Sequence, residues 1–291
     1  MSRSPPLPAE FEPDVLRRLY IDLADFSDDA LKAHYEQWGR AEGRVASEAV
    51  YRERFLDLIV TDGPALEVGP YFNPLLRGGN VRYLDMYAAE ALRQRALWEG
   101  HDAAGCPEEI HFVGGFEACP EDAFEVVFSS HAIEHQPDLV GHLKQVERVL
   151  QPGGRYMMIV PDSRYCFDRT LPLSRISEVI QAHEEKRQSH ALATVIDHYM
   201  FSDHNDPVEH WRGNHSPSVR TGEECIRAAR LASHSADGVY IDAHAWRFCP
   251  TSFREIVATL NETGLLNLTP LRIYDTPFGR FEFMAALQKC G

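Results

Sequence analysis

Long apolar runs are missing from this sequence of 291 residues. None approaches the roughly 20 residues that a membrane-spanning helix needs, so no membrane span is predicted. The amino-terminal segment, Met-Ser-Arg-Ser-Pro-Pro-Leu-Pro, lacks the apolar core of a signal peptide. Residues 1–10 are therefore expected to form a disordered tail.

Closely spaced cysteines are missing as well. The six cysteines occur singly, without a Cys-x-x-Cys pair. This usage is typical of the reducing cytoplasm, where we expect the protein to reside, and it argues against a disulfide framework or a zinc ribbon.

Positive charge is also scarce, since the sequence has 29 Lys and Arg but 44 Asp and Glu, for a net charge of −15. Lys and Arg are what bind phosphate backbones, so no nucleic-acid partner is expected.

The sequence does contain enough apolar residues for a large core. Hydrophobic residues make up 44% and charged residues 25%, as in ordinary globular proteins. A chain of this length can form one large domain with a small appendage. Residues 11–46 are expected to be that appendage, a helical module. Ser27 is placed to cap a helix on which Leu31, Tyr35 and Trp38 recur with the spacing of one apolar face.

The main domain is expected over residues 47–291. Its apolar runs at residues 65–68 and 81–86 predict buried parallel strands, each followed by a turn and a helix. Gly69 ends the first strand and has no side chain to obstruct a ligand. Asp85 ends the second, at the edge where open α/β sheets bind nucleosides. A carboxylate there can accept both hydroxyls of a ribose.

Five more strands and several helices complete the prediction. The strands are expected at residues 110–113, 124–130, 155–160, 269–275 and 281–287. The helices are expected at residues 47–61, 88–98, 137–150 and 250–260. Residues 163–248 are too many for a plain connection and are expected to form an insertion, with helices at residues 174–185, 191–200 and 221–231.

Three motifs, in the same order, resemble those of class I S-adenosylmethionine-dependent methyltransferases. They are Glu-Val-Gly-Pro-Tyr-Phe-Asn-Pro, Ser-Ser-His-Ala-Ile-Glu-His and, before the fifth strand, Leu-Gln-Pro-Gly-Gly. The resemblance covers residues 50–162 and implies a Rossmann-like three-layer α/β sandwich. Its seven-stranded sheet would be mostly parallel with an antiparallel last strand, and the insertion would form a helical lid. Tyr71 occupies a position where the family usually has a second glycine.

The same resemblance implies S-adenosyl-L-methionine as the cofactor. The residues that it places at the cofactor are Glu67, Gly69, Pro70, Asp85, Ser130 and His131. In many relatives an acid after the third strand holds the adenine amine, but here Gly114 and Gly115 follow that strand.

Two further stretches resemble methyltransferases of bacterial surface-polysaccharide clusters. They are the end of the helical module, Tyr-Glu-Gln-Trp-Gly-Arg-Ala-Glu-Gly-Arg, and the segment Val-Pro-Asp-Ser-Arg-Tyr-Cys-Phe-Asp. They imply O-methylation of a sugar, with a glycosyltransferase as a partner. Two alternatives stay open: methylation of a small metabolite, and a non-catalytic subunit that binds a glycosyltransferase.

A sugar hydroxyl needs a general base, and histidine suits that task near neutral pH. His131 directly follows the fourth predicted strand and is our candidate base, with stacking on the cofactor as the alternative. Glu134 and His135, which follow it, are more often structural. Asp162 is expected to orient a base and Arg164 to hold an acidic sugar or a diphosphate. The alternative for these two is a buried ion pair.

Histidines are also frequent in the insertion. The spacings between His198, His204, His210 and His215 match no known pattern of metal ligands. We therefore expect a polar lid with solvated histidines and no metal site, with a magnesium ion held by the neighbouring acids or a zinc site as the alternatives. The role of His244 is left open.

Overall fold

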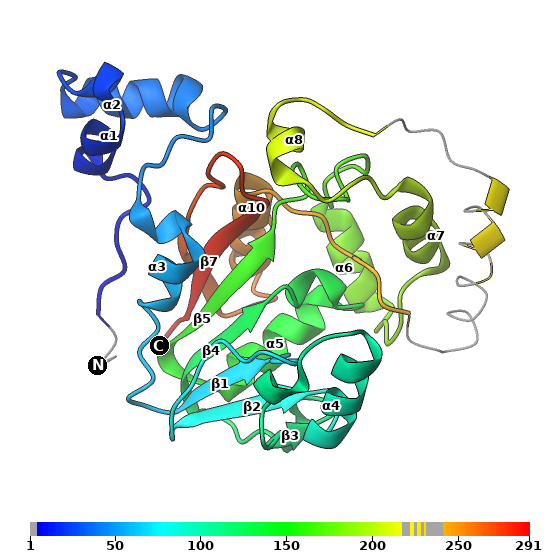
Figure 1. Cartoon of the computed structure of the whole chain (residues 1–291). Helices are drawn as coiled ribbons and strands as arrows, with labels where there is room; N and C mark the ends of the chain where they lie inside the picture. Colours follow the sequence, from blue (N-terminus) through cyan, green and yellow to red (C-terminus); the bar gives the residue numbers. More distant parts are fainter. Residues whose placement is uncertain (1–4, 217–221, 224–225, 228–229, 231–240) are drawn as a thin grey trace.

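The computed structural model describes residues 5–216, 222–223, 226–227, 230 and 241–291. Its sheet has seven strands in the order β3-β2-β1-β4-β5-β7-β6 (Figure 1). Their bounds are β1 Ala65–Val68, β2 Val81–Asp85, β3 Phe112–Val113, β4 Phe124–Ser130, β5 Leu150–Pro161, β6 Leu268–Ile273 and β7 Glu282–Lys289. β7 runs antiparallel to both of its neighbours, and the other pairs are parallel. The predicted Rossmann-like sheet is confirmed.

Helices cover both faces of this sheet. On one face lie α5 (Leu139–Val149), α6 (Ile176–Glu184) and α10 (Pro250–Glu262), which pack on one core cluster with β4, β5 and β7. On the other face lie α3 (Arg52–Leu56) and α4 (Ala89–Trp98). The predicted apolar stripe, Leu139, Leu143, Val146 and Leu150, is fully buried, and Leu150 is already the first residue of β5. The three-layer sandwich is therefore confirmed.

The helix predicted over residues 47–61 is divided in two. A 3₁₀ turn at Glu48–Val50 precedes the short helix α3. Apolar side chains of both pieces, Val50 and Phe55, are buried against the sheet. The apolar pattern therefore identified the buried positions correctly but overestimated the length of the helix.

The amino-terminal module contains α1 (Pro13–Leu19) and α2 (Asp28–His34). Ser27 caps α2 as predicted, since its Oγ accepts a hydrogen bond from the Ala30 amide at 3.3 Å. Leu31 and Tyr35 are buried, but Trp38 is 49% exposed, so its predicted place on the apolar face is wrong. The chain continues after α2 as a π-helix, which turns more residues per repeat than an α-helix and rotates Trp38 out of the stripe.

Residues 5–10 do not form the disordered tail that the composition predicts. They cross the outer end of the sheet beside β6. Arg272 Nε and Tyr274 Oη both donate to the Pro8 carbonyl at 2.9 Å, and the Ile273 amide donates to Glu10 Oε1 at 2.7 Å. Proline has no backbone N–H, so an extended proline-rich segment leaves fewer amide donors without an acceptor.

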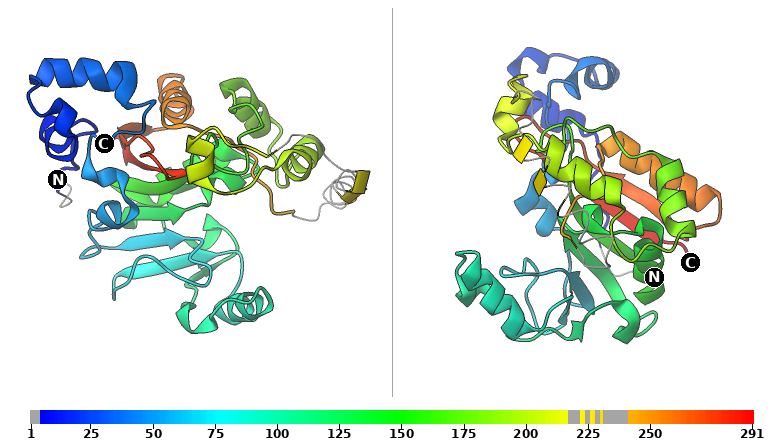
Figure 2. Two further views of the ribbon diagram at one scale, coloured as in Figure 1. Left: turned by 45° about the horizontal axis from the view of Figure 1, so that its top comes forward. Right: turned by 90° about the vertical axis from the view of Figure 1, so that its right-hand side faces the viewer.

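The insertion after β5 contributes α6, α7 (Leu192–Phe201) and α8 (Pro207–Trp211). α6 is part of the layer beside α5, whereas α7 and α8 lie beyond the carboxyl ends of the strands (Figures 1 and 2). The helix predicted over residues 221–231 falls largely outside the described residues. Among the described residues, no helix has the length and apolar character that crossing a bilayer requires.

Candidate active site

The turn after β1 and the acid after β2 lie side by side, as the sequence predicts. The Gly69 amide donates to the Leu84 carbonyl at 2.8 Å, and Leu84 directly precedes Asp85. Gly69 has a φ of +70°, a conformation that a residue with a Cβ adopts only at a cost. A Cβ built there would lie 4.0 Å from the nearest atom, on Ala132. The requirement for glycine is therefore conformational rather than steric.

Tyr71 occupies the position of the second glycine of the motif and has a φ of 47°, in the left-handed region that favours glycine. Its side chain lies against α4. The ring is 5.1 Å from the Arg95 guanidinium, and the hydroxyl is hydrogen-bonded to Glu99. These contacts hold a non-glycine residue in a backbone conformation that costs free energy.

Asp85 lies at the carboxyl edge of the sheet and is 8% exposed. Burial raises the pKa of its carboxyl group, while Oδ1 accepts a hydrogen bond from the Tyr87 amide at 3.0 Å. Three large side chains near this carboxylate are exposed: Met86, Tyr87 and Val113. An acid beside open apolar surface suits a ribose with an attached adenine ring.

Glu67 lies in β1 and is almost fully buried. Burial raises the pKa of its carboxyl group to about 7, against the opposing effect of two backbone hydrogen bonds. Both bonds come from the loop after the glycine turn, from the amides of Leu75 and Leu76, each at 2.9 Å. Glu67 thus anchors this loop, in which Pro70 is also buried. Cofactor contacts of Glu67 and Pro70 stay predictions.

His131 directly follows β4, with a φ of 50°. Its Nε2 lies 2.9 Å from Glu282 Oε2. Glu282 also accepts hydrogen bonds from Arg52 Nε and Nη2, at 3.0 and 2.6 Å. Burial would raise the pKa of Glu282, but the bonds from His131 and Arg52 outweigh it and lower the pKa to about 2. Arg52 Nη1 reaches Ser130 Oγ as well, at 3.3 Å, which joins the end of β4 to this group.

Glu282 and Arg52 were not predicted from the sequence. Glu282 is the first residue of β7, opposite Pro161 at the end of β5. Because β7 is antiparallel, its first residue lies where the parallel strands end. An acid directly before the apolar run at residues 283–287 was the available signal.

Asp162 and Arg164 form the ion pair that was the alternative to catalysis, but only Asp162 is fully buried, and the Arg164 side chain is 44% exposed. Arg164 Nε and Nη2 donate to the two Asp162 oxygens at 2.9 and 2.6 Å, and Thr276 Oγ1 donates to Oδ2 at 2.7 Å. Burial would lower the pKa of Arg164, but the bonds to Asp162 raise it. These contacts fix the segment after β5, and a catalytic role for either residue stays a prediction.

Of the four insertion histidines, His210 is buried and His215 is exposed as predicted. His210 is 4% exposed and stacks on His204 with a centroid distance of 4.0 Å. Burial lowers the pKa of His198 to about 4. Within the described part of the chain, two groups bring ligand-type atoms within 4.8 Å of one another: Glu134 with His135 and His244, and Asp203 with His210 and His215. The first lies beside His131, whose Nδ1 is 3.6 Å from Glu134 Oε1.

Residues 69–158 match the methyltransferase domain family, which spans the glycine turn to the middle of β5. Solved structures with a similar arrangement include a SAM-dependent methyltransferase from Aquifex aeolicus, at 12% identity and a TM-score of 0.39, covering 96% of this chain and 99% of that chain. A putative S-adenosylmethionine-dependent methyltransferase from Listeria monocytogenes has 12% identity and a TM-score of 0.41, with coverages of 88% and 100%. Geranyl diphosphate methyltransferase in complex with SAM has 14% identity and a TM-score of 0.33, with coverages of 93% and 95%.

Structures with TM-scores this low support no inference about function. The methyltransferase activity is inferred from the family match and the strand order. The match includes Gly69, Asp85 and His131. The described residues fit the cofactor of that family, since they provide the glycine turn, the acid after β2 and the apolar surface beyond it. The chain thus contains a methyltransferase domain, and its cofactor is S-adenosylmethionine.

Proposed function

We propose that this enzyme methylates an oxygen acceptor, with His131 as the general base. The observation that carries the proposal is the pair between His131 and Glu282 at the same sheet edge as Gly69 and Asp85. A base next to the cofactor site is required for a hydroxyl, whose pKa lies far above 7. An acceptor whose nucleophilic atom is already unprotonated would not need a general base.

The protein's own residues divide this work. Glu282 holds His131 through Nε2, which leaves the Nδ1 lone pair to accept the proton of the acceptor hydroxyl. Asp85 binds the ribose, and the Gly69 turn lets the backbone pass close to the cofactor. The cofactor supplies an electrophilic methyl group on sulfonium sulfur, so that a C–O bond forms while the C–S bond breaks with its electron pair on sulfur. Alignment of the two reactants can contribute on the order of 7 to 11 kcal/mol.

We further propose a sugar as the acceptor, within a bacterial surface glycan or its precursor. Three aromatic side chains gather beside the ends of β5 and β7. Tyr165 stacks on Trp211 at 3.8 Å, and Phe278, which is 53% exposed, lies 5.6 Å from Trp211. Aromatic faces suit the C–H faces of sugar rings. The helical module reaches the same place, since the Phe278 amide donates to the Gly43 carbonyl at 2.9 Å.

A small metabolite is the second candidate acceptor, and a glycosyltransferase partner and a cytoplasmic location belong to the sugar proposal. Transfer of labelled methyl from S-adenosylmethionine to a panel of nucleotide sugars and to a polysaccharide fraction tests the acceptor class. His131→Gln should lower turnover by roughly 100-fold with cofactor binding unchanged. Unchanged turnover in this variant would remove His131 as the base. Cofactor binding weaker than millimolar by calorimetry would favour the non-catalytic alternative instead.

A further inference from the structure

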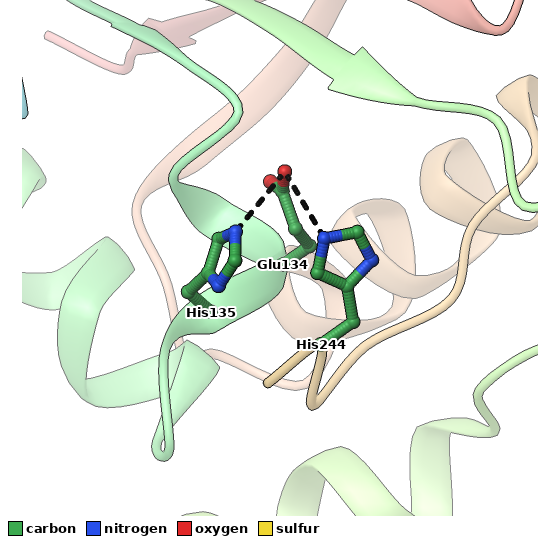
Figure 3. Close-up of side chains that lie close together, drawn as sticks. All are labelled: Glu134, His135 and His244. Carbon is green, nitrogen blue, oxygen red and sulfur yellow. Dashed lines mark ion pairs between the residues drawn. The ribbon is translucent and has the colours of Figure 1, made fainter. Parts of the chain in front are cut away.

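A buried carboxylate lies at the centre of a group of imidazole rings. Glu134 is fully buried, and neither of its carboxylate oxygens has a hydrogen-bond partner among the described residues. His135 Nε2 lies 3.7 Å from Glu134 Oε1, and His244 Nε2 lies 3.9 Å from it (Figure 3). These separations exceed hydrogen-bond lengths. A buried charge without hydrogen bonds is unfavourable unless something else compensates it.

The other nitrogen of each ring faces a carboxylate. His135 Nδ1 is 2.9 Å from Asp242 Oδ1, and His244 Nδ1 is 2.5 Å from the buried Asp168 Oδ2. The His244 contact is a hydrogen bond, whereas the His135 contact is an ion pair. In metal-binding histidines a carboxylate behind the ring commonly turns the opposite nitrogen toward the ion. Here the two opposite nitrogens, both Nε2, face the same oxygen of Glu134.

The three side chains are held in place by backbone contacts between distant segments. The amides of Ala245 and Trp246 both donate to the Glu134 carbonyl, at 2.8 and 3.1 Å. The Trp246 indole donates to the Gln136 carbonyl at 2.6 Å. The loop that carries His244 is thereby fixed to the turn that carries Glu134 and His135. Such preorganisation is what a specific binding site requires.

We propose that Glu134, His135 and His244 bind one divalent transition-metal ion of the zinc class. Ligand atoms about 2.1 Å from a tetrahedral ion lie about 3.4 Å apart, close to the observed separations. Imidazole nitrogens suit zinc, iron or nickel, whereas Mg²⁺ prefers oxygen ligands. Three protein ligands leave a fourth position open for an exogenous oxygen.

If the proposed function holds, the location of this site gives the ion a role in binding the acceptor hydroxyl. His131 Nδ1, the proposed proton acceptor, is 3.6 Å from Glu134 Oε1. An ion among the three ligands would therefore hold the acceptor hydroxyl beside the base and lower its pKa. The ion would also compensate the buried charge of Glu134. The expectation of no metal site was drawn from the spacing of histidines along the sequence. It did not consider residues far apart in the sequence, such as His135 and His244, that the fold brings together.

Metal binding can be tested without cofactor or acceptor. The full chain is stripped with a chelator, and zinc is titrated by calorimetry with the bound metal quantified by mass spectrometry. We expect one zinc ion per wild-type chain and none at the same free zinc in Glu134→Gln or His244→Gln. Asp168→Asn keeps the three ligands and should weaken binding by roughly 10- to 100-fold. His210→Gln, in the other histidine group, is the matched control and should bind as the wild type does.

Cobalt in place of zinc reports the ligand set in the wild type, and circular dichroism checks that each variant is folded. We expect visible d–d bands without the charge-transfer band of a thiolate. A wild type that binds no zinc stoichiometrically, a thiolate band from the free cysteines, or a folded His244→Gln that still binds zinc would overturn the site. Zinc binding without any methyl transfer would leave the site intact and contradict the proposed function. Methyl transfer by a zinc-free chain would leave the proposed function intact and contradict the role of the ion in it.

Discussion

Replacing Glu282 by Gln tests the group that joins β4, β7 and α3. The substitution keeps the size of the side chain and removes the charge that His131 and Arg52 share. A pKa of about 2, against an ordinary value of 4.5, corresponds to about 3 kcal/mol of folding free energy at neutral pH. Because the pKa is lowered in the folded state, this stability is present above pH 4.5 and is lost as the pH falls toward 2.

Urea unfolding at pH 7, followed by circular dichroism, measures this loss. Glu282→Gln should lower the free energy of unfolding by about 3 kcal/mol. Glu255→Gln, at an exposed position of α10, is the control and should stay within about 0.5 kcal/mol of the wild type. If the two variants were equally stable, the charge of Glu282 would not hold this corner of the fold.

The kinetics of Glu282→Gln distinguish a role in orienting His131 from a role in binding the cofactor. Glu282 touches the proposed base but is not expected to touch the cofactor. Glu282→Gln should therefore lower kcat by about 100-fold, as for a displaced base, and leave the KM for S-adenosylmethionine unchanged. A rise in KM with kcat unchanged would place Glu282 in cofactor binding and refute its role in positioning His131.

Three other changes give distinct results. Asp85→Asn should weaken S-adenosylmethionine binding by about 10- to 100-fold in calorimetry, because charge-assisted hydrogen bonds contribute about 1.5–3 kcal/mol; unaltered binding would remove the ribose contact. Gly69→Ala should lower the free energy of unfolding by about 1–2 kcal/mol, since its φ is positive and its Cβ meets no close atom; a neutral effect would show that the turn adapts. Burial lowers the pKa of His142 to about 4, so its stabilising effect is present above pH 6.5 and lost as the pH falls toward 4. Between pH 6.5 and 4, the free energy of unfolding measured by denaturant titration should fall by up to about 3 kcal/mol less in His142→Gln than in the wild type. The same pH dependence in both proteins would contradict this.

The sequence by itself determined the domain type and one half of the site. Short apolar runs, glycine turns and caps are local patterns, so they located the strands and α5 to within a few residues. The contact between the Gly69 turn and the strand that ends at Asp85 could be predicted because parallel strands end at one edge of a sheet. Trp38 was misplaced because a single π-helical turn changes the phase of an otherwise regular pattern.

Only the tertiary structure decided the other half. Glu282 meets His131 across 151 positions of the chain because β7 enters the sheet antiparallel to β5, with its first residue opposite Pro161. His244 reaches Glu134 because two backbone amides fix its loop to the turn after β4. Hydrophobic periodicity specifies which face of an element is buried, but not which distant polar side chains the packing then brings together. The base's partner and the proposed metal ligands are therefore properties of the folded chain.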